Sequence, residues 1–413
     1  MGMWERRFDY YIVLAVLVAG ITKRAQFPFS RWLPAAMAAP TPVSALVHSS
    51  TLVTAGVFLL IRFYNYISQM FYFERVLLVV SCVTIFLAAF SAIMETDLKK
   101  IIALSTLSQL GVMMASLAVG LPKLALFHLA THALFKALLF ICAGSFIFLH
   151  SHNQDLRLVG NLSLQLPLTR ACFIIGRISL CGLPFLAGFY SKDLILEVIL
   201  SRMRRMVIMR LIILATGATA FYRMRLANYR VLSPRFGRPY HNLTDEDKNI
   251  ILPCLNLTLG AIFGGAAINW LLGPFRVETF IPLSLKLMPL YLRILGAIFS
   301  FKLRRLITVS GRFGEKFPLI HEFICSMWFL SPLRSQGALK FLKPAYYYLS
   351  VVDHGWVEGI RAQGAWGLIK DVSQKIQPVQ GKIVNIMLSL RILSVLMLLV
   401  IFCLDNLNFK IQY

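Results

Sequence analysis

The chain has 413 residues, of which 58% are hydrophobic and 15% are charged, and its mean hydropathy is +0.71. Soluble domains carry about a quarter charged residues, so this composition excludes an ordinary soluble domain and indicates a polytopic membrane protein. The formal net charge of +24 is spread over loops and segment ends, and no nucleic-acid-reading motif accompanies it. We therefore expect contact with anionic lipid and no binding to nucleic acid.

The cysteines and glycines indicate no redox or nucleotide site within the chain. The seven cysteines include no Cys-x-x-Cys pair, and most lie in apolar runs, where cysteine behaves as a small core residue. The sequence contains no dinucleotide-binding glycine motif and no phosphate-binding P-loop,. We therefore expect this chain to bind no metal, flavin, nucleotide or iron–sulfur cluster.

The sequence has ten apolar runs, and most of them approach the roughly 20 residues that a membrane-spanning helix needs. The first run follows Arg6 and Arg7 as in a signal peptide, but further spans follow it, so we interpret it as a membrane helix. The sequence predicts an all-α, polytopic membrane bundle of about ten transmembrane helices, some of them broken. In chain order the runs cover residues 10–22, 40–63, 76–94, 101–119, 124–149, 166–200, 206–221, 250–272, 280–301 and 386–403.

The sixth run is long enough to cross a bilayer, but Gly182, Pro184 and Gly188 interrupt it. Proline removes a backbone donor and clashes with the preceding turn, so two half-helices are expected. The second half brings Lys192 and Asp193 into the apolar layer. Irregular backbone is tolerated there only where protein or water satisfies it, so these ionisable residues are a candidate functional site. The alternative is a simple proline kink, with Lys192 snorkelling to the surface.

Two more candidate residues lie near the amino end. Lys23 ends the first run, before a proline-rich stretch at 28–42 that predicts a second helix interruption,. Lys23 fits an interfacial anchor equally well. Helical spacing places His48 on one face with Ser44 and Thr51, and a histidine among hydroxyls can carry a proton near neutral pH. The alternative for His48 is a neutral ring that bonds a backbone carbonyl.

Three protonatable residues have the most specific spacing. His128, His132 and Lys136 follow one another at intervals of four, so they share one face of a membrane helix. Such groups are costly against lipid and must face the protein interior or water. Two histidines at this spacing can bind a metal, but no acidic residue stands nearby to complete the site. We favour a proton relay, which with the ionisable residues described above suggests a lateral row of titratable groups.

The carboxyl-terminal part differs from the rest. Residues 302–382 are mixed in polarity, and within them 345–379 are amphipathic and carry interfacial aromatic residues. This composition is typical of a long helix along the membrane surface, and an ordinary loop is the alternative. We expect a proton-translocation transmembrane domain over 1–301 and a carboxyl-terminal region over 302–413 that contains this surface helix and the last apolar run. The aromatic residues are Tyr346, Tyr347, Tyr348, Trp356 and Trp366.

Four stretches are long enough to carry a resemblance, namely 19–53, 97–111, His128-Leu-Ala-Thr-His-Ala-Leu-Phe-Lys-Ala and Gly188-Phe-Tyr-Ser-Lys-Asp. They resemble the chain 5 family of mitochondrial NADH-ubiquinone oxidoreductases, which are antiporter-like subunits of respiratory complex I. A weaker similarity continues through Asp353-His-Gly-Trp to the carboxyl end. Motifs of this length are highly specific to the family.

The resemblance implies two inverted repeats of five helices, each with one broken helix, followed by a long lateral helix and an anchoring helix. Residues 345–379 would belong to the lateral helix. The implied proton-translocation residues are Lys23 of the first broken helix, His48 as a linking histidine, His128, His132 and Lys136 of a central relay, and Lys192 with Asp193 of the second broken helix.

By the same resemblance, we expect a core membrane subunit of NADH:ubiquinone oxidoreductase that contributes to proton translocation coupled to electron transfer from NADH to ubiquinone. NADH, FMN, iron–sulfur clusters and ubiquinone would be bound by other subunits. The expected partners are neighbouring antiporter-like subunits and the bilayer of the mitochondrial inner membrane, with cardiolipin as a candidate lipid. The alternatives are a stand-alone cation/proton antiporter of related fold and a structural scaffold without transport.

Two departures from the family pattern bear on these expectations. The family carries a further amino-terminal region, which includes the acidic partner of the first lysine. We therefore expect a fragment, a misplaced start, or one piece of a split subunit. The second departure is Arg177, which stands in the apolar half of the broken helix where a small or polar residue is expected. An unpaired charge there is expensive, so Arg177 needs a partner or a water-filled cavity.

Overall fold

The structure is a computed structural model, and the residues that it describes are nearly all helical. The chain divides into two compact units, Met1–Ser331 and Pro332–Tyr413. The predicted boundary between a proton-translocation domain (1–301) and a carboxyl-terminal region (302–413) is a functional one, and it stays a prediction. The described residues are 3–70, 72–149, 152–156, 166–202, 206–228, 248–271, 282–307, 317–358, 362–380 and 384–409.

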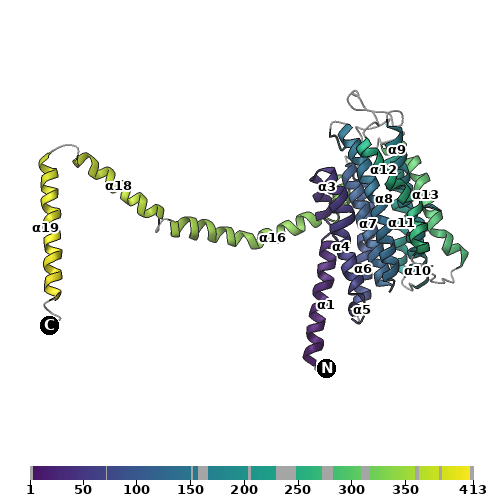
Figure 1. The fold of residues 1–413 in the computed structure, drawn as a ribbon, viewed down its shortest axis with the longest axis horizontal. Coiled ribbons are helices and arrows are strands. Elements are labelled where there is room, and N and C mark those ends of the chain that lie inside the picture. Colours follow the sequence, from purple (N-terminus) through teal and green to yellow (C-terminus); the bar gives the residue numbers. More distant parts are fainter. Residues whose placement is uncertain are drawn as a thin grey trace. The chain divides into compact units, whose positions relative to one another are not determined.

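Each predicted apolar run corresponds to one helix or to consecutive shorter helices (Figure 1). Within the described ranges, six helices are long and apolar enough to cross a membrane, and three shorter apolar helices accompany them. The all-α class is therefore confirmed, whereas the exact number of spans stays a prediction. The six long helices are α6 (Phe73–Met94), α7 (Leu98–Ala118), α8 (Pro122–Leu149), α11 (Met206–Ala227), α12 (Lys248–Leu271) and α13 (Leu283–Ile307).

The central helix of the first unit is α7, whose apolar stretch is buried along its whole length. A helix buried on every side must satisfy its polar groups internally. Ser108 and Ser116 do so by donating to the carbonyl oxygen three residues earlier. The neighbours of α7 are α6, which packs on α11, and α8, which packs on α9 (Pro167–Cys181) and α12. On the far side of α11 lies α13.

Two segments are interrupted where glycine and proline predict it, so the expected broken helices are confirmed. In the first, α1 (Met3–Lys23) is followed by short helices and the π-helix η2 (Val47–Thr51), which leads into α4 (Leu52–Arg62). In the second, α9 stops and the π-helix η3 (Phe189–Asp193) leads into α10 (Leu194–Arg202). The remaining short helices of the first unit are α2 (Trp32–Ala35), η1 (Ala36–Ala38), α3 (Thr41–Leu46), α5 (Tyr64–Ile67) and α15 (Pro318–Cys325).

The second unit is also helical. Its described elements are α16 (Leu330–Tyr347), whose first two residues belong to the first unit, the π-helix η5 (Tyr348–Val357), α18 (Ala362–Gln380) and α19 (Val384–Phe409). The predicted interfacial aromatic side chains on these elements are exposed. A position along a membrane surface for the 345–379 segment stays a prediction, as does the anchoring role of α19.

Candidate functional site

The break between α9 and η3 depends on two glycines. Gly182 closes α9 in the left-handed conformation, with φ of 76°, which glycine adopts without strain. At Gly188 an added Cβ would collide with the carbonyl oxygen of Ser179, so glycine lets the chain fold back against the end of α9. The π-helix that follows carries Ser191 and Lys192 into the interior. Single π-turns of this kind are frequent at functional sites.

Ser191 links this break to the histidine stripe on α8. Its hydroxyl oxygen lies 2.9 Å from Nδ1 of His128 and 3.0 Å from the hydroxyl oxygen of Thr131. All three side chains are fully buried. Sequence reasoning missed Ser191, because 63 residues separate it from His128. Only its place beside Lys192 could have suggested it.

The stripe continues along α8 toward α7. The ring centres of His128 and His132 are 6.2 Å apart, and neither ring nitrogen of His132 has a hydrogen-bond partner among the described residues. Lys136 is fully buried and donates to the carbonyl oxygen of Ile102 at 3.2 Å and to the hydroxyl of Ser105. The three residues thus share one helix face, which points into protein. Their role as a relay stays a prediction.

Lys192 and Asp193 are adjacent but differ in their partners. Lys192 is 1% exposed, so it does not snorkel, and its Nζ has no hydrogen-bond partner in the described part of the chain. Asp193 accepts two hydrogen bonds from Arg293 on α13, one of 2.9 Å at Oδ2 and a second at Oδ1. Arg293 also donates to the carbonyl oxygen of Gly182 at 2.6 Å, a group that a helix end leaves unsatisfied. No sequence pattern indicated Arg293, because 100 residues separate it from Asp193.

No described hydrogen bond joins the two candidates near the amino end to this cluster. Lys23 is exposed in the last turn of α1, whereas the neighbouring Arg24 is fully buried. His48 is half-buried in η2, and its Nδ1 has no hydrogen-bond partner among the described residues. The expected common face of His48 with Ser44 and Thr51 is wrong, because Ser44 is buried while Thr51 is exposed. The intervening π-helix changes the helical register.

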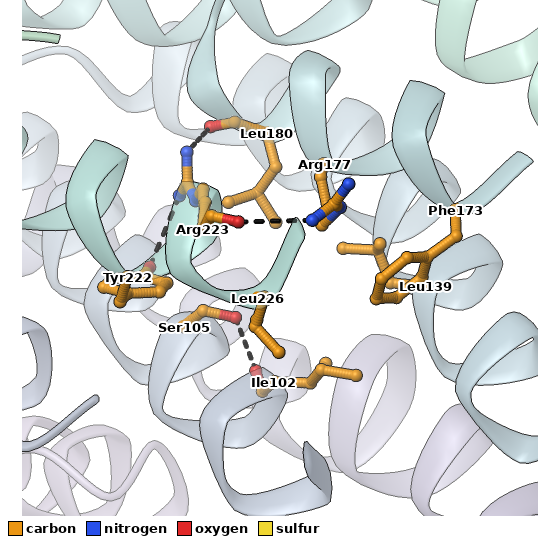
Figure 2. A pocket seen from close by; sticks show the side chains of 9 residues that line it. All are labelled: Ile102, Ser105, Leu139, Phe173, Arg177, Leu180, Tyr222, Arg223 and Leu226. Atoms are coloured by element: carbon orange, nitrogen blue, oxygen red, sulfur yellow. Dashed lines mark hydrogen bonds between the residues drawn. The ribbon is translucent and has the colours of Figure 1, made fainter. Parts of the chain in front are cut away.

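Arg177 contacts the backbone of a second buried arginine, Arg223, and an aromatic ring. Its guanidinium donates to the backbone carbonyl oxygen of Arg223 at 3.2 Å and lies 4.7 Å from the centre of the Phe173 ring. Arg223 donates to the carbonyl oxygen of Leu180 and to the hydroxyl of Tyr222. Figure 2 shows both arginines on the wall of a cavity of about 10 Å³. A carbonyl, an aromatic face and a small cavity therefore surround this charge.

A larger cavity of about 180 Å³ lies near the start of α7, between α2 and α15. Lys100 on its wall pairs with Glu95 at 3.5 Å and with Asp97 at 2.7 Å. Burial raises the pKa of the Cys325 thiol to about 11, so this thiol stays protonated near neutral pH and is a poor nucleophile or metal ligand. Among the residues described, no group of three or more His, Cys, Asp or Glu side chains could hold a metal ion.

Comparison with known proteins assigns the chain to a family. Residues 4–219 match the NADH:quinone oxidoreductase/Mrp antiporter transmembrane family, and residues 222–402 match the carboxyl terminus of NADH dehydrogenase subunit 5. NADH-ubiquinone oxidoreductase chain 5 of Lumbricus terrestris is 48% identical over 91% of this chain, and that of Anopheles gambiae is 43% identical over 95%. The chain belongs to the NADH-ubiquinone oxidoreductase chain 5 family.

The match to this family is partial in length. The aligned region is 65% of the Lumbricus terrestris protein and 67% of the Anopheles gambiae protein, so the chain spans about two thirds of these relatives. A chain of the Mrp complex from Dietzia sp. DQ12-45-1b shares the fold, with a TM-score of 0.66 and 23% identity, over 92% of this chain and 42% of that one. The expected membrane helix bundle is thereby confirmed.

Proposed function

We propose that the chain is a core membrane subunit of NADH:ubiquinone oxidoreductase, respiratory complex I, and contributes to its proton translocation. The observation that carries the proposal is the buried row of Lys136, His132 and His128 on α8, which the Ser191 hydroxyl extends onto η3 beside Lys192. Protonatable groups are costly inside a membrane, and a buried set of them on two packed elements favours a proton pathway. The name that the relatives carry, NADH-ubiquinone oxidoreductase chain 5, supports the same function.

In this proposal, each buried group holds a proton for part of a cycle. Nζ of Lys136 exchanges a proton with His132, whose two ring nitrogens can accept on one side and release on the other. A water at the unpartnered nitrogens of His132 would complete the connection,. The hydroxyl of Ser191 both donates and accepts hydrogen bonds, so it can pass the proton between His128 and Lys192.

The remaining candidate residues have other places in the proposal. Lys23 is the lysine of the first broken helix in this proposal, and His48 is the linking histidine. Asp193 acts through its pair with Arg293, which occupies both carboxylate oxygens. The carboxylate beside Lys192 is therefore engaged, and the lysine ammonium is left for exchange with the row.

The electron-carrying groups lie elsewhere in this proposal. We propose that NADH, FMN, the iron–sulfur clusters and ubiquinone are bound by other subunits, and that this chain contributes no redox site. Its proposed partners are neighbouring antiporter-like subunits of the membrane arm, and its proposed location is the mitochondrial inner membrane. Cardiolipin is a candidate lipid because the chain carries a net charge of +24,.

A second candidate function is that of a stand-alone cation/proton antiporter. The observation in its favour is the match of residues 4–219 to a family whose description joins NADH:quinone oxidoreductase and Mrp antiporter. The match of residues 222–402 to the subunit 5 carboxyl terminus favours the complex I subunit instead.

Purification separates these two functions. The chain, tagged at its carboxyl end in its native membrane and extracted in mild detergent, should migrate on a native gel with a large NADH-oxidising assembly. That assembly, reconstituted in vesicles, should move protons when NADH and a quinone are added. A chain that migrates alone and exchanges Na⁺ or K⁺ for protons without NADH would contradict the proposal and favour the antiporter.

A further inference from the structure

The small cavity lined by Arg177 and Arg223 lies next to Lys136, the residue at one end of the proposed proton row. Ser105 on α7 accepts a hydrogen bond from Nζ of Lys136 and also lines this cavity. Arg177 and Arg223 form another part of the wall (Figure 2). Lys136 and the two arginines are therefore separated by one serine side chain and a space of about 10 Å³. This volume is about that of one water molecule.

The cavity wall has two positive charges and no negative one. Its nine lining residues, all in the described part of the chain, include no aspartate or glutamate. The described partners of Arg177 and Arg223 are all neutral: backbone carbonyls, the Tyr222 hydroxyl and aromatic rings. The Nε atom of each arginine has no hydrogen-bond partner among the described residues. Two uncompensated guanidinium groups at this depth are costly, which favours a functional role over a purely structural one.

The cavity lies on the side of Lys136 where α7 begins. The residues before α7 pair with the segment after α8, since Leu98 N–H donates to the Gln154 carbonyl at 3.1 Å and Leu156 N–H donates to the Thr96 carbonyl at 3.1 Å. Arg223 lies in the last two turns of α11, which ends on this side, next to the Ala92 and Glu95 carbonyls that Arg225 contacts. A proton that left Lys136 through this cavity would therefore move toward the α7-start end of the bundle.

We propose that Arg177 and Arg223 form an electrostatic barrier that keeps a proton on Lys136 from escaping toward this end of the bundle. A water in the cavity accepts hydrogen bonds from guanidinium groups, and the fixed positive charges disfavour its conversion to hydronium. Arginine suits this task because it stays protonated in proteins. This inference rests on the proposed function, in which Lys136 holds a proton for part of a cycle.

The test measures passive proton entry into vesicles that contain the assembled complex. A potassium gradient with valinomycin sets the membrane potential, no NADH is present, and an enclosed dye reports the internal pH. Arg177→Met and Arg223→Met should each raise the proton leak roughly tenfold, which corresponds to ~1.4 kcal/mol of barrier. Arg177→Gln keeps a donor for the Arg223 carbonyl but loses the charge, so it should leak like Arg177→Met and serves if a methionine variant fails to assemble.

Two control variants separate the effect of the arginine charge at the cavity from the effect of cavity size and from the effect of removing a charge elsewhere. Leu226→Ala enlarges the same cavity without changing its charge, and it should leave the leak at the wild-type level. Arg210→Met removes an exposed charge from α11, the helix that carries Arg223. This variant should also leave the leak at the wild-type level. The proposal is overturned if Leu226→Ala leaks as much as the arginine variants, or if all three arginine variants stay as tight as wild type. The same vesicles are then given NADH and quinone, because wild-type complex that oxidises NADH without pumping would overturn the proposed function instead.

Discussion

Arg293 and Asp193 form a buried ion pair in which the guanidinium contacts both carboxylate oxygens. The Arg293 side chain is 4% exposed and that of Asp193 is 15% exposed. Because the same guanidinium donates to the carbonyl oxygen of Gly182, it ties α13 to both sides of the break in the second interrupted helix. The pair fixes the segment that carries Lys192.

Arg293→Met should destabilise the assembled complex by about 3–5 kcal/mol, because it leaves the carboxylate of Asp193 buried without its partner. Asp193→Leu should have a similar effect for the same reason. The double variant should recover much of the loss, since replacing both members of a buried pair by apolar residues is often close to neutral. The measurement is the thermal dissociation of the complex in all four forms. Additive losses in the double variant would mean that the two residues do not stabilise each other.

The sequence predicted the parts of this site that depend on local spacing and failed on those that depend on packing. Glycine and proline indicated the break, and the interval of four residues indicated the stripe on α8. Arg293 and Ser191 could not be predicted, because contacts across 100 and 63 residues arise only when α13 and η3 pack. Nor could the sequence decide whether Lys23 or Arg24 is buried. Adjacent helical residues point in different directions, and only the packing of the helix determines which direction faces the protein interior.

Gly188→Ala should prevent normal assembly of the subunit. The added methyl group would collide with the backbone of Ser179, and a backbone atom cannot move aside without shifting the end of α9. Gly367→Ala on α18 is the matched control, because a Cβ there has no neighbour within 4 Å. The control should be neutral or slightly stabilising. The yield of assembled complex on a native gel measures both, and equal yields would show that the close approach at Gly188 is unimportant.

Ser191→Ala should slow proton-coupled turnover roughly tenfold, which corresponds to ~1.4 kcal/mol. It removes the hydroxyl that contacts both His128 and Thr131. It leaves unchanged the close approach of Gly188 to the end of α9. Ser191→Thr keeps the hydroxyl and should retain most of the rate. Ser201→Ala is the control, because within the described ranges that hydroxyl donates only to the nearby Val198 carbonyl. Full activity in Ser191→Ala would remove Ser191 from the pathway.

Shortening the 345–379 segment should loosen the subunit from its neighbours more than it alters its fold. Trp366, Ile369, Val372 and Ile376 form an exposed apolar stripe on α18, which gains stability only by contact with a membrane or a partner. The measurement is the amount of subunit that co-purifies with the complex, compared with the amount inserted in the membrane. Full co-purification of the shortened chain would contradict a clamping role.

The proton-to-electron ratio of the reconstituted complex tests most directly whether Lys192 exchanges protons with the buried row on α8. Lys192→Met keeps the length of the side chain and removes its charge, so the ratio should fall strongly while the subunit still inserts. Lys192→Arg keeps the charge but cannot release a proton, so it should not restore the ratio. A ratio in Lys192→Arg equal to that of wild type would contradict the account and make Lys192 a fixed electrostatic group.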